Sequence, residues 1–147
     1  MATEAPTLWY VNGLKTLMRA GMGIASVSGT LKFVMLHDTY VLDQDAHDFL
    51  DDIIAHEASG TGYPAGGITV GTPAVTIDAA TNQSIFDFDN ITGLSVPCCY
   101  GVLALSTGTN STSPLLTVTD FSAGDAVDQT VTSLVVNSLG HAALTAA

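Results

Sequence analysis

The chain has 147 residues, of which 3 are Lys or Arg and 14 are Asp or Glu, so its formal net charge is -11. Nucleic-acid binding takes its affinity from clustered basic side chains, and no Lys or Arg follows Lys32. The composition argues against nucleic acid and anionic membranes as partners, and no apolar run reaches the ~20 residues that cross a bilayer.

Charge is sparse as well as one-sided. Charged residues make up 12% of the chain and hydrophobic residues 47%, whereas charged residues usually make up ~25%. Such a surface must be largely neutral and polar or be covered by other subunits, so we expect a homo-oligomer. Glu4 and Pro6 stand where a secretory signal would carry positive charge, and we expect a protein made in a cytoplasm.

Residues 1–10 are predicted to form an arm without a regular element, and residues 11–147 a single β-sandwich domain. The arm ends in three apolar side chains, Leu8, Trp9 and Tyr10. A segment with no core of its own buries such side chains against another element or a neighbouring subunit, and aromatic anchors often dominate interfaces. These three residues are therefore predicted to form an interface.

A short helix is predicted to follow the arm. Asn12 has the side chain to cap its first turn, and Gly21 is placed to end it. The predicted apolar face has i, i+3, i+4 spacing and consists of Leu14, Leu17 and Met18.

Residues 31–36 are short and apolar and precede a turn, which predicts a strand. One or two helical turns are then predicted after Asp45, with an apolar face and an acidic face. The apolar face consists of Phe49, Leu50, Ile53 and Ile54, and the acidic face of Asp48, Asp51 and Asp52. The Gly-rich residues 59–67 are predicted to be loop.

The remaining sequence predicts short strands separated by turn residues, at 68–70, 74–77, 84–88, 99–105, 115–119 and 130–136. No helical periodicity intervenes, which favours a mainly β fold, an antiparallel β-sandwich or open barrel with a short N-terminal helix and one further helical turn. Tyr63 in the Gly-rich loop and Asn110 in a turn are predicted as further interface residues.

One segment gathers potential metal ligands, namely His37, Asp38, Asp43, Asp45, His47, Asp48, Asp51, Asp52, His56 and Glu57. Residues from Asp43 onward match the start of a calcium loop, but Asp48 stands where that loop needs Gly and Ile54 where it needs Glu. His56 has no second His four residues later, as a zinc-protease helix requires. The pattern predicts a solvated, helix-capping acidic face, with an adventitious divalent-cation site as the alternative and no catalytic metal.

Catalytic patterns are weak elsewhere. Asp87 and Asp89 share one face of a predicted strand, a pairing that glycoside hydrolysis uses, but their sequence context is typical of a strand end and turn. No Gly-x-Ser-x-Gly elbow is present, and neither Cys98 nor Cys99 stands beside a His or a cation. We predict no enzymatic activity and no cofactor, with both thiols reduced because adjacent strand side chains point to opposite faces.

Three stretches carry a further signal, Leu-Lys-Phe-Val-Met-Leu-His-Asp-Thr-Tyr at 31–40, Asp-Gln-Asp-Ala-His-Asp-Phe-Leu-Asp-Asp-Ile at 43–53 and Gly-Thr-Gly-Tyr-Pro-Ala-Gly-Gly at 60–67. Phe-Asp-Phe-Asp-Asn at 86–90 and Thr-Ser-Pro-Leu-Leu at 112–116 follow in order. Together these stretches resemble a family of small structural proteins of tailed bacteriophages, over most of residues 11–121. Members of that family are variously called head, neck or minor tail proteins.

The resemblance implies a structural protein of a phage virion. Low charge and an adhesive arm suit packing between neighbours, so the expected role is decoration or cementing of the capsid exterior, through contacts with the major capsid protein or other virion subunits. A tail or neck component is the alternative. A carbohydrate-binding module for host attachment is a third reading, although the aromatic residues that stack on sugars are scattered, at Trp9, Tyr10, Tyr40, Tyr63 and Tyr100.

Overall fold

The computed structural model describes residues 7–10, 13, 31–80, 83–136 and 142–145. Within these ranges the elements are antiparallel strands and short 3-10 turns, so the predicted mainly β fold is confirmed. The finer prediction of a sandwich or an open barrel is not confirmed. The helix predicted from Asn12 to Gly21 lies outside the described residues, apart from Gly13. None of the helical elements in the described ranges has the length and apolar character needed to cross a membrane.

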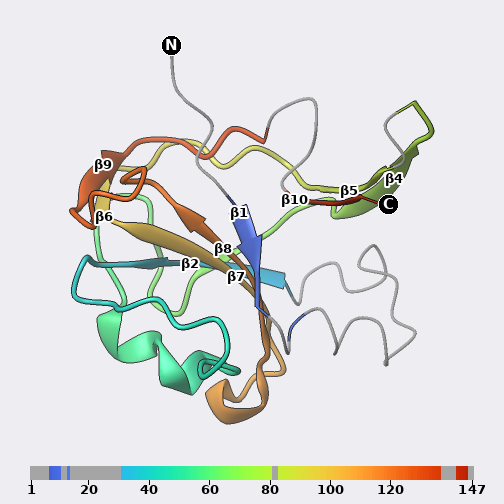
Figure 1. Ribbon diagram of the computed structural model, residues 1–147. Helices are drawn as coiled ribbons and strands as arrows, with labels where there is room; N and C mark the ends of the chain where they lie inside the picture. Colours follow the sequence, from blue (N-terminus) through green and yellow to red (C-terminus); the bar gives the residue numbers. More distant parts are fainter. Residues whose placement is uncertain (1–6, 11–12, 14–30, 81–82, 137–141, 146–147) are drawn as a thin grey trace.

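The largest sheet has five antiparallel strands in the order β1-β8-β7-β2-β3 (Figure 1). Their bounds are Thr7–Trp9 (β1), Leu115–Asp120 (β8), Tyr100–Leu105 (β7), Leu31–Leu36 (β2) and Ile68–Thr69 (β3). β7 lies at the centre, between β8 and β2. Its pairing with β2 runs from Leu31 opposite Leu105 to Leu36 opposite Tyr100.

Two smaller antiparallel sheets complete the described strands. One has the order β10-β5-β4, with bounds Ala142–Thr145, Gln83–Asp87 and Ala74–Asp78. The other pairs β6 with β9, with bounds Val96–Cys98 and Gln129–Val131. Figure 1 shows the hairpin of β4 and β5 extending away from the five-stranded sheet.

Both faces of the five-stranded sheet are buried. Because side chains alternate along a strand, β2 sends Phe33 and Met35 into one core and Val34 and Leu36 into a second. The first core also takes side chains from β5, β6 and β9, and the second takes them from residues 40–54. A strand that is buried on both faces has a nearly continuous apolar sequence. β2 and β7 both have such sequences.

Gly101 in β7 lies against side chains of the first core, with no space for a side chain of its own. A Cβ at this position would overlap the Phe33 ring and lie 2.9 Å from Cε2 of Phe121. Phe33 also packs against Phe88, with ring centroids 6.4 Å apart. The absence of a side chain at Gly101 is therefore a requirement of core packing.

The prediction that residues 1–10 lack a regular element is wrong for Thr7–Trp9, which form β1 at the edge of the sheet. Thr7 lies opposite Thr119, and their hydroxyl oxygens are 2.9 Å apart. The backbone N–H of Tyr10 extends the pairing by donating to the carbonyl of Leu116 over 2.9 Å. Tyr10 itself is fully buried in the second core, so the chain at β1 is tied down by its own domain.

The further helical turn predicted after Asp45 is present as two 3-10 turns, η2 (Leu50–Asp52) and η3 (Ile54–His56). Leu50 and Ile53 are buried as predicted, whereas 37% of Phe49 is exposed. Phe49 is extended because it forms a β-bridge with Pro114. A third 3-10 turn, η4 (Asn110–Thr112), precedes β8.

Cys98 and Cys99 both carry free, buried thiols. Cys98 belongs to the first core and Cys99 to the second, so the two neighbours point to opposite faces, as predicted. Burial raises the pKa of the Cys98 thiol to about 12, with smaller contributions from the Asp128 and Cys99 charges.

Candidate functional site

The outer edge of β8 carries two segments in succession. β1 pairs with it first, from Thr7 opposite Thr119 to Trp9 opposite Thr117. Beyond β1, the N–H of Leu115 donates to the carbonyl of Asp48 over 2.9 Å, and the N–H of Leu50 donates to the carbonyl of Ser113 over 3.0 Å. Residues 7–10 and 48–50 therefore lie one after the other along the same edge.

Side-chain contacts fasten residues 40–47 to β1. The Gln44 amide donates to the carbonyl of Trp9. The Tyr40 hydroxyl is 2.9 Å from the Tyr10 hydroxyl and 2.9 Å from Nδ1 of His47. The Gln44 contact satisfies one carbonyl of an edge strand, where backbone groups otherwise remain unpaired.

Large apolar side chains remain exposed along this edge. Leu8 on β1 is 46% exposed, Val41 in the covering segment 77% and Phe49 37%. We call Leu8, Val41 and Phe49 the apolar edge. Leu8 and Phe49 lie on the two segments that follow the outer edge of β8, and Val41 lies in the segment that contacts residues 9 and 10 through Tyr40 and Gln44. Most exposed apolar residues in proteins are instead scattered singly.

The predicted interface residues fall into three different settings. Leu8 is on the apolar edge, and Trp9 is partly buried beside it. Asn110 is exposed in η4, which contacts η2 close to Phe49. Tyr10, predicted as an adhesive side chain, is a core residue instead, because its ring packs in the second core and its hydroxyl meets Tyr40.

Tyr63 lies apart from these residues, against the first core. Its hydroxyl accepts from the N–H of Met35 over 3.1 Å and donates to Oε1 of Glu57 over 2.8 Å. Burial raises the pKa of Tyr63. These contacts give Tyr63 a structural role in closing the loop at residues 59–67.

Sequence reasoning missed Val41 and Phe49 as surface residues. Phe49 was assigned to a helical apolar face, and the spacing that suggested this was correct for Leu50 and Ile53. Phe49 differs from Leu50 and Ile53 because it forms a β-bridge with Pro114, which holds it in an extended conformation outside the turn. That pairing is long-range, so the local pattern did not contain it.

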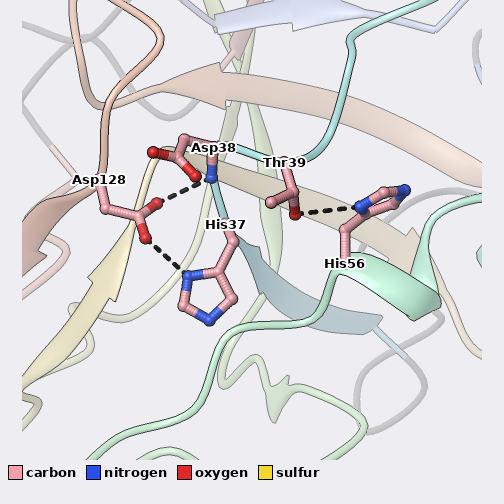
Figure 2. Close-up of polar contacts among 5 residues, drawn as sticks. All are labelled: His37, Asp38, Thr39, His56 and Asp128. Atoms are coloured by element: carbon pink, nitrogen blue, oxygen red, sulfur yellow. Dashed lines mark hydrogen bonds and ion pairs between the residues drawn. The ribbon is translucent and has the colours of Figure 1, made fainter.

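The His and Asp residues after β2 form the second candidate site (Figure 2). Nδ1 of His37 is 2.7 Å from Oδ2 of Asp128, and the N–H of Asp38 donates to the other oxygen of that carboxylate over 2.8 Å. The hydroxyl of Thr39 lies 3.1 Å from Nδ1 of His56. Asp128 precedes β9, so its carboxylate ties the end of β2 to the approach to β9.

A hydroxyl hydrogen-bonded to an imidazole is the start of a nucleophile and base pair. In the part of the chain that the structure describes, no carboxylate is hydrogen-bonded to the His56 ring to orient it as such catalysis requires. The Asp128 carboxylate is engaged with His37 and Asp38 instead. The contact between Thr39 and His56 therefore joins the turn after β2 to η3. It lacks the third group of a catalytic triad.

Three further carboxylates of this segment bind backbone N–H groups. Asp43 accepts from the N–H groups of Asp45 and Ala46, and Asp52 accepts from those of Asp48 and Phe49. Glu57 accepts from Gly66 over 2.7 Å. Within the described ranges, no three His, Cys, Asp or Glu side chains converge as metal ligands.

Comparison of the chain with protein-family models, with curated proteins and with solved structures finds no match. The described part of the molecule combines an exposed apolar edge with carboxylates and imidazoles that are held by intramolecular bonds.

Proposed function

We propose that the protein is a structural component of a bacteriophage virion and binds the outer surface of the capsid as a decoration or cement protein. One structural observation supports adhesion above other roles. Leu8, Val41 and Phe49 remain 46%, 77% and 37% exposed on or beside the segments that follow a single sheet edge. The phage assignment comes from the ordered motifs at residues 31–67, 86–90 and 112–116.

Charge supports the same proposal. The net charge of -11 over 147 residues favours the solubility of free copies. The apolar edge itself consists of uncharged side chains, so docking it removes hydrophobic surface from water. Exposed carboxylates at Asp43, Asp45, Asp51 and Asp52 lie on the same segment, so docking must leave them in solvent or pair them with the partner.

A carbohydrate-binding role is not favoured by the aromatic residues. Sugar stacking needs an exposed ring face, but Tyr10, Tyr40 and Tyr100 are 0%, 2% and 8% exposed. Trp9 and Tyr63 are only partly exposed and lie on different parts of the fold. A tail or neck component remains the second candidate, because the apolar edge suits packing into a ring or around a tube as well.

The test is rebinding to virus particles that lack the protein. A triple variant combines Leu8→Ser, Val41→Ser and Phe49→Ser. It is compared with a control variant that combines Val127→Ser and Val135→Ser, which remove exposed apolar side chains elsewhere on the fold. We expect the triple variant to fold, by circular dichroism, and to bind about tenfold or more weakly in co-sedimentation. The control variant should bind as the unmodified chain does.

Equal binding by the triple variant and the unmodified chain would contradict adhesion through this edge. Failure of the unmodified chain to bind particles of any kind would contradict the virion role itself. Hundreds of copies per particle would indicate capsid decoration or a tail tube, and about a dozen or fewer would indicate a neck or tip. Negative-stain microscopy with a labelled chain then separates head from tail.

A further inference from the structure

The outer edge of β4 is open in the described part of the molecule. β4 pairs with β5 on one side, in a continuous register from Ala74 opposite Asp87 to Asp78 opposite Gln83. On the other side, no strand of the described ranges is paired with it. An unpaired strand edge presents a row of N–H and C=O groups that readily accepts another strand.

Other edges of the fold are short or blunted. β3 has two residues and β1 has three, one of whose carbonyls is covered by Gln44. β6 contains Pro97, which lacks an N–H to donate. β4 has five residues, Ala-Val-Thr-Ile-Asp, with no Lys, no Pro and no bulge in its pairing, so the charged Asp78 at its end is its main protection against pairing with another strand.

We propose that β4 pairs with β4 of a second copy of this chain, in antiparallel orientation about a two-fold axis at Thr76. The six strands β10-β5-β4 and their symmetry mates then form one continuous sheet. A closed two-fold contact uses the same surface on both copies. The hairpin of β4 and β5 extends from the body of the molecule (Figure 1).

The register follows from the alternation of side chains. A two-fold axis perpendicular to the sheet keeps each side chain on its own face, so the axis must pass beside a residue that faces its own copy. Only an axis at Thr76 pairs all five residues of β4, with Ala74 opposite Asp78 and Val75 opposite Ile77. Thr76 is exposed, and facing Thr side chains are a favourable cross-strand pair.

Charge permits this register. Each Asp78 faces the neutral Ala74 of the other copy, and the two Asp78 residues are four positions apart along the strands, about 13 Å. That separation exceeds the Debye length of about 8 Å at physiological ionic strength. An axis at Ile77 would instead place Asp78 opposite Thr76 and carry Ala74 beyond the end of the strand.

β10 is the other open edge of this sheet among the described residues, but it has four residues. A two-fold axis beside any one of them pairs at most three with their symmetry mates, so β4 offers the longer contact. The proposed pairing does not depend on a role in a virion. It is tested with the purified chain alone, so its failure leaves the binding to virus particles unaffected.

The first experiment replaces Thr76 by Cys. Directly opposite residues in an antiparallel pair have Cα atoms about 4.5 to 5.5 Å apart, within the range that a disulfide spans. Under mild oxidant, the Thr76→Cys chain should form a covalent dimer on a non-reducing gel. Thr69→Cys on β3, also exposed, is the matched control and should remain largely uncrosslinked, as should the unmodified chain with its buried thiols.

The second experiment changes the charge at the axis. Thr76→Lys and Thr76→Asp each place like charges opposite one another, which weakens cross-strand pairing, and we expect about tenfold weaker self-association by sedimentation equilibrium. An equimolar mixture of the two variants should recover a heterodimer. The proposal is overturned if the unmodified chain stays monomeric, or if it dimerises without crosslinking at Thr76 and without response to either charge.

Discussion

Tyr40 connects the N-terminal strand to the segment that covers the second core. Its hydroxyl lies between the hydroxyl of Tyr10 and the imidazole of His47. Its ring packs edge-on against the ring of Tyr100, with the two ring centroids 5.6 Å apart. Burial raises the pKa of Tyr10 and of Tyr40. Both hydroxyls therefore stay protonated and act as neutral hydrogen-bonding groups inside the fold.

The two tyrosines should respond differently to loss of the hydroxyl. Tyr40→Phe leaves the fully buried Tyr10 hydroxyl without its partner, which should lower the free energy of unfolding by about 1 to 3 kcal/mol. Tyr10→Phe leaves Tyr40 bonded to His47, so the loss should be about 1 kcal/mol or less. Urea denaturation of both variants measures the difference.

The double variant is the control for this ordering. When both hydroxyls are absent, no buried donor is left unpaired, so the cost should be less than the sum of the single costs. Equal effects of Tyr40→Phe and Tyr10→Phe would show that the Tyr10 hydroxyl finds another partner.

Sequence reasoning succeeded unevenly for single residues. The apolar character of Leu8 and Tyr10 is evident from the chain, but their fates differ, one on the surface and one in the core. What separates them is the pairing of β1 with β8, more than 100 residues away, and that pairing leaves no local trace. The need for glycine at Gly101 is hidden for the same reason, because Phe33 and Phe121 approach it from distant parts of the chain.

At the scale of elements, the segment from Asp43 to Glu57 illustrates how carboxylates can serve structure. Asp43, Asp52 and Glu57 each accept at least one backbone N–H. Such contacts stabilise turns in a chain whose 3-10 helices are too short to satisfy their own ends. We therefore expect the segment to hold its shape without a cation.

Chelation should accordingly leave the melting temperature unchanged. Asp43, Asp52 and Glu57 are engaged with backbone donors, and within the described ranges no three potential ligands converge, whereas stabilisation by a metal requires a completed ligand set. Thermal unfolding with and without a chelator is the measurement. A drop of several degrees that one particular cation restores would contradict this expectation.

Element boundaries were predictable where a strand is buried on both faces. The predicted strands at 31–36 and 115–119 match β2 and β8 closely, because apolar and β-branched residues between turn signals mark them. β6 was not predicted, since Pro97 argues against a strand and its single partner β9 is distant in sequence. The strand predicted at 130–136 ends at Val131, and Leu134 instead forms an isolated bridge with Ile91.

For the whole molecule, the mainly β class could be predicted from turn spacing and apolar periodicity. The burial of both faces of the five-stranded sheet could not, because it depends on which distant segments cover each face. The apolar edge also belongs to this scale. It exists only because β1 and residues 48–50 meet on the same side of β8.

Alkaline pH should destabilise the fold as a whole. Burial raises the pKa of Cys98 from 9.0 to about 12 and that of Tyr100 from 10.0 to about 12. The unfolded chain therefore loses these protons first. The stability from Cys98 is complete below pH 9.0 and is lost as pH rises towards 12, by up to about 1.4 kcal/mol per pH unit.

Urea denaturation across this interval tests the sign and the assignment. Cys98→Ala is expected to be less stable near neutral pH, because it leaves a cavity, but its stability should fall less steeply just above the ordinary pKa of a thiol. Identical slopes for the variant and the unmodified chain would show that Cys98 does not carry the effect.

The strand order also has a consequence for how each copy is made. β2 has its principal partner in β7, with Leu31 opposite Leu105. β1 can pair only after β8 has been synthesised, because Thr7 lies opposite Thr119. Folds dominated by such non-local contacts form slowly, and synthesis at about 5 to 20 residues per second leaves β2 unpaired for several seconds at least. During that time its apolar side chains are open to aggregation, so we expect the yield of this protein in cells to depend more on translation speed and chaperone supply than on the stability of the finished fold.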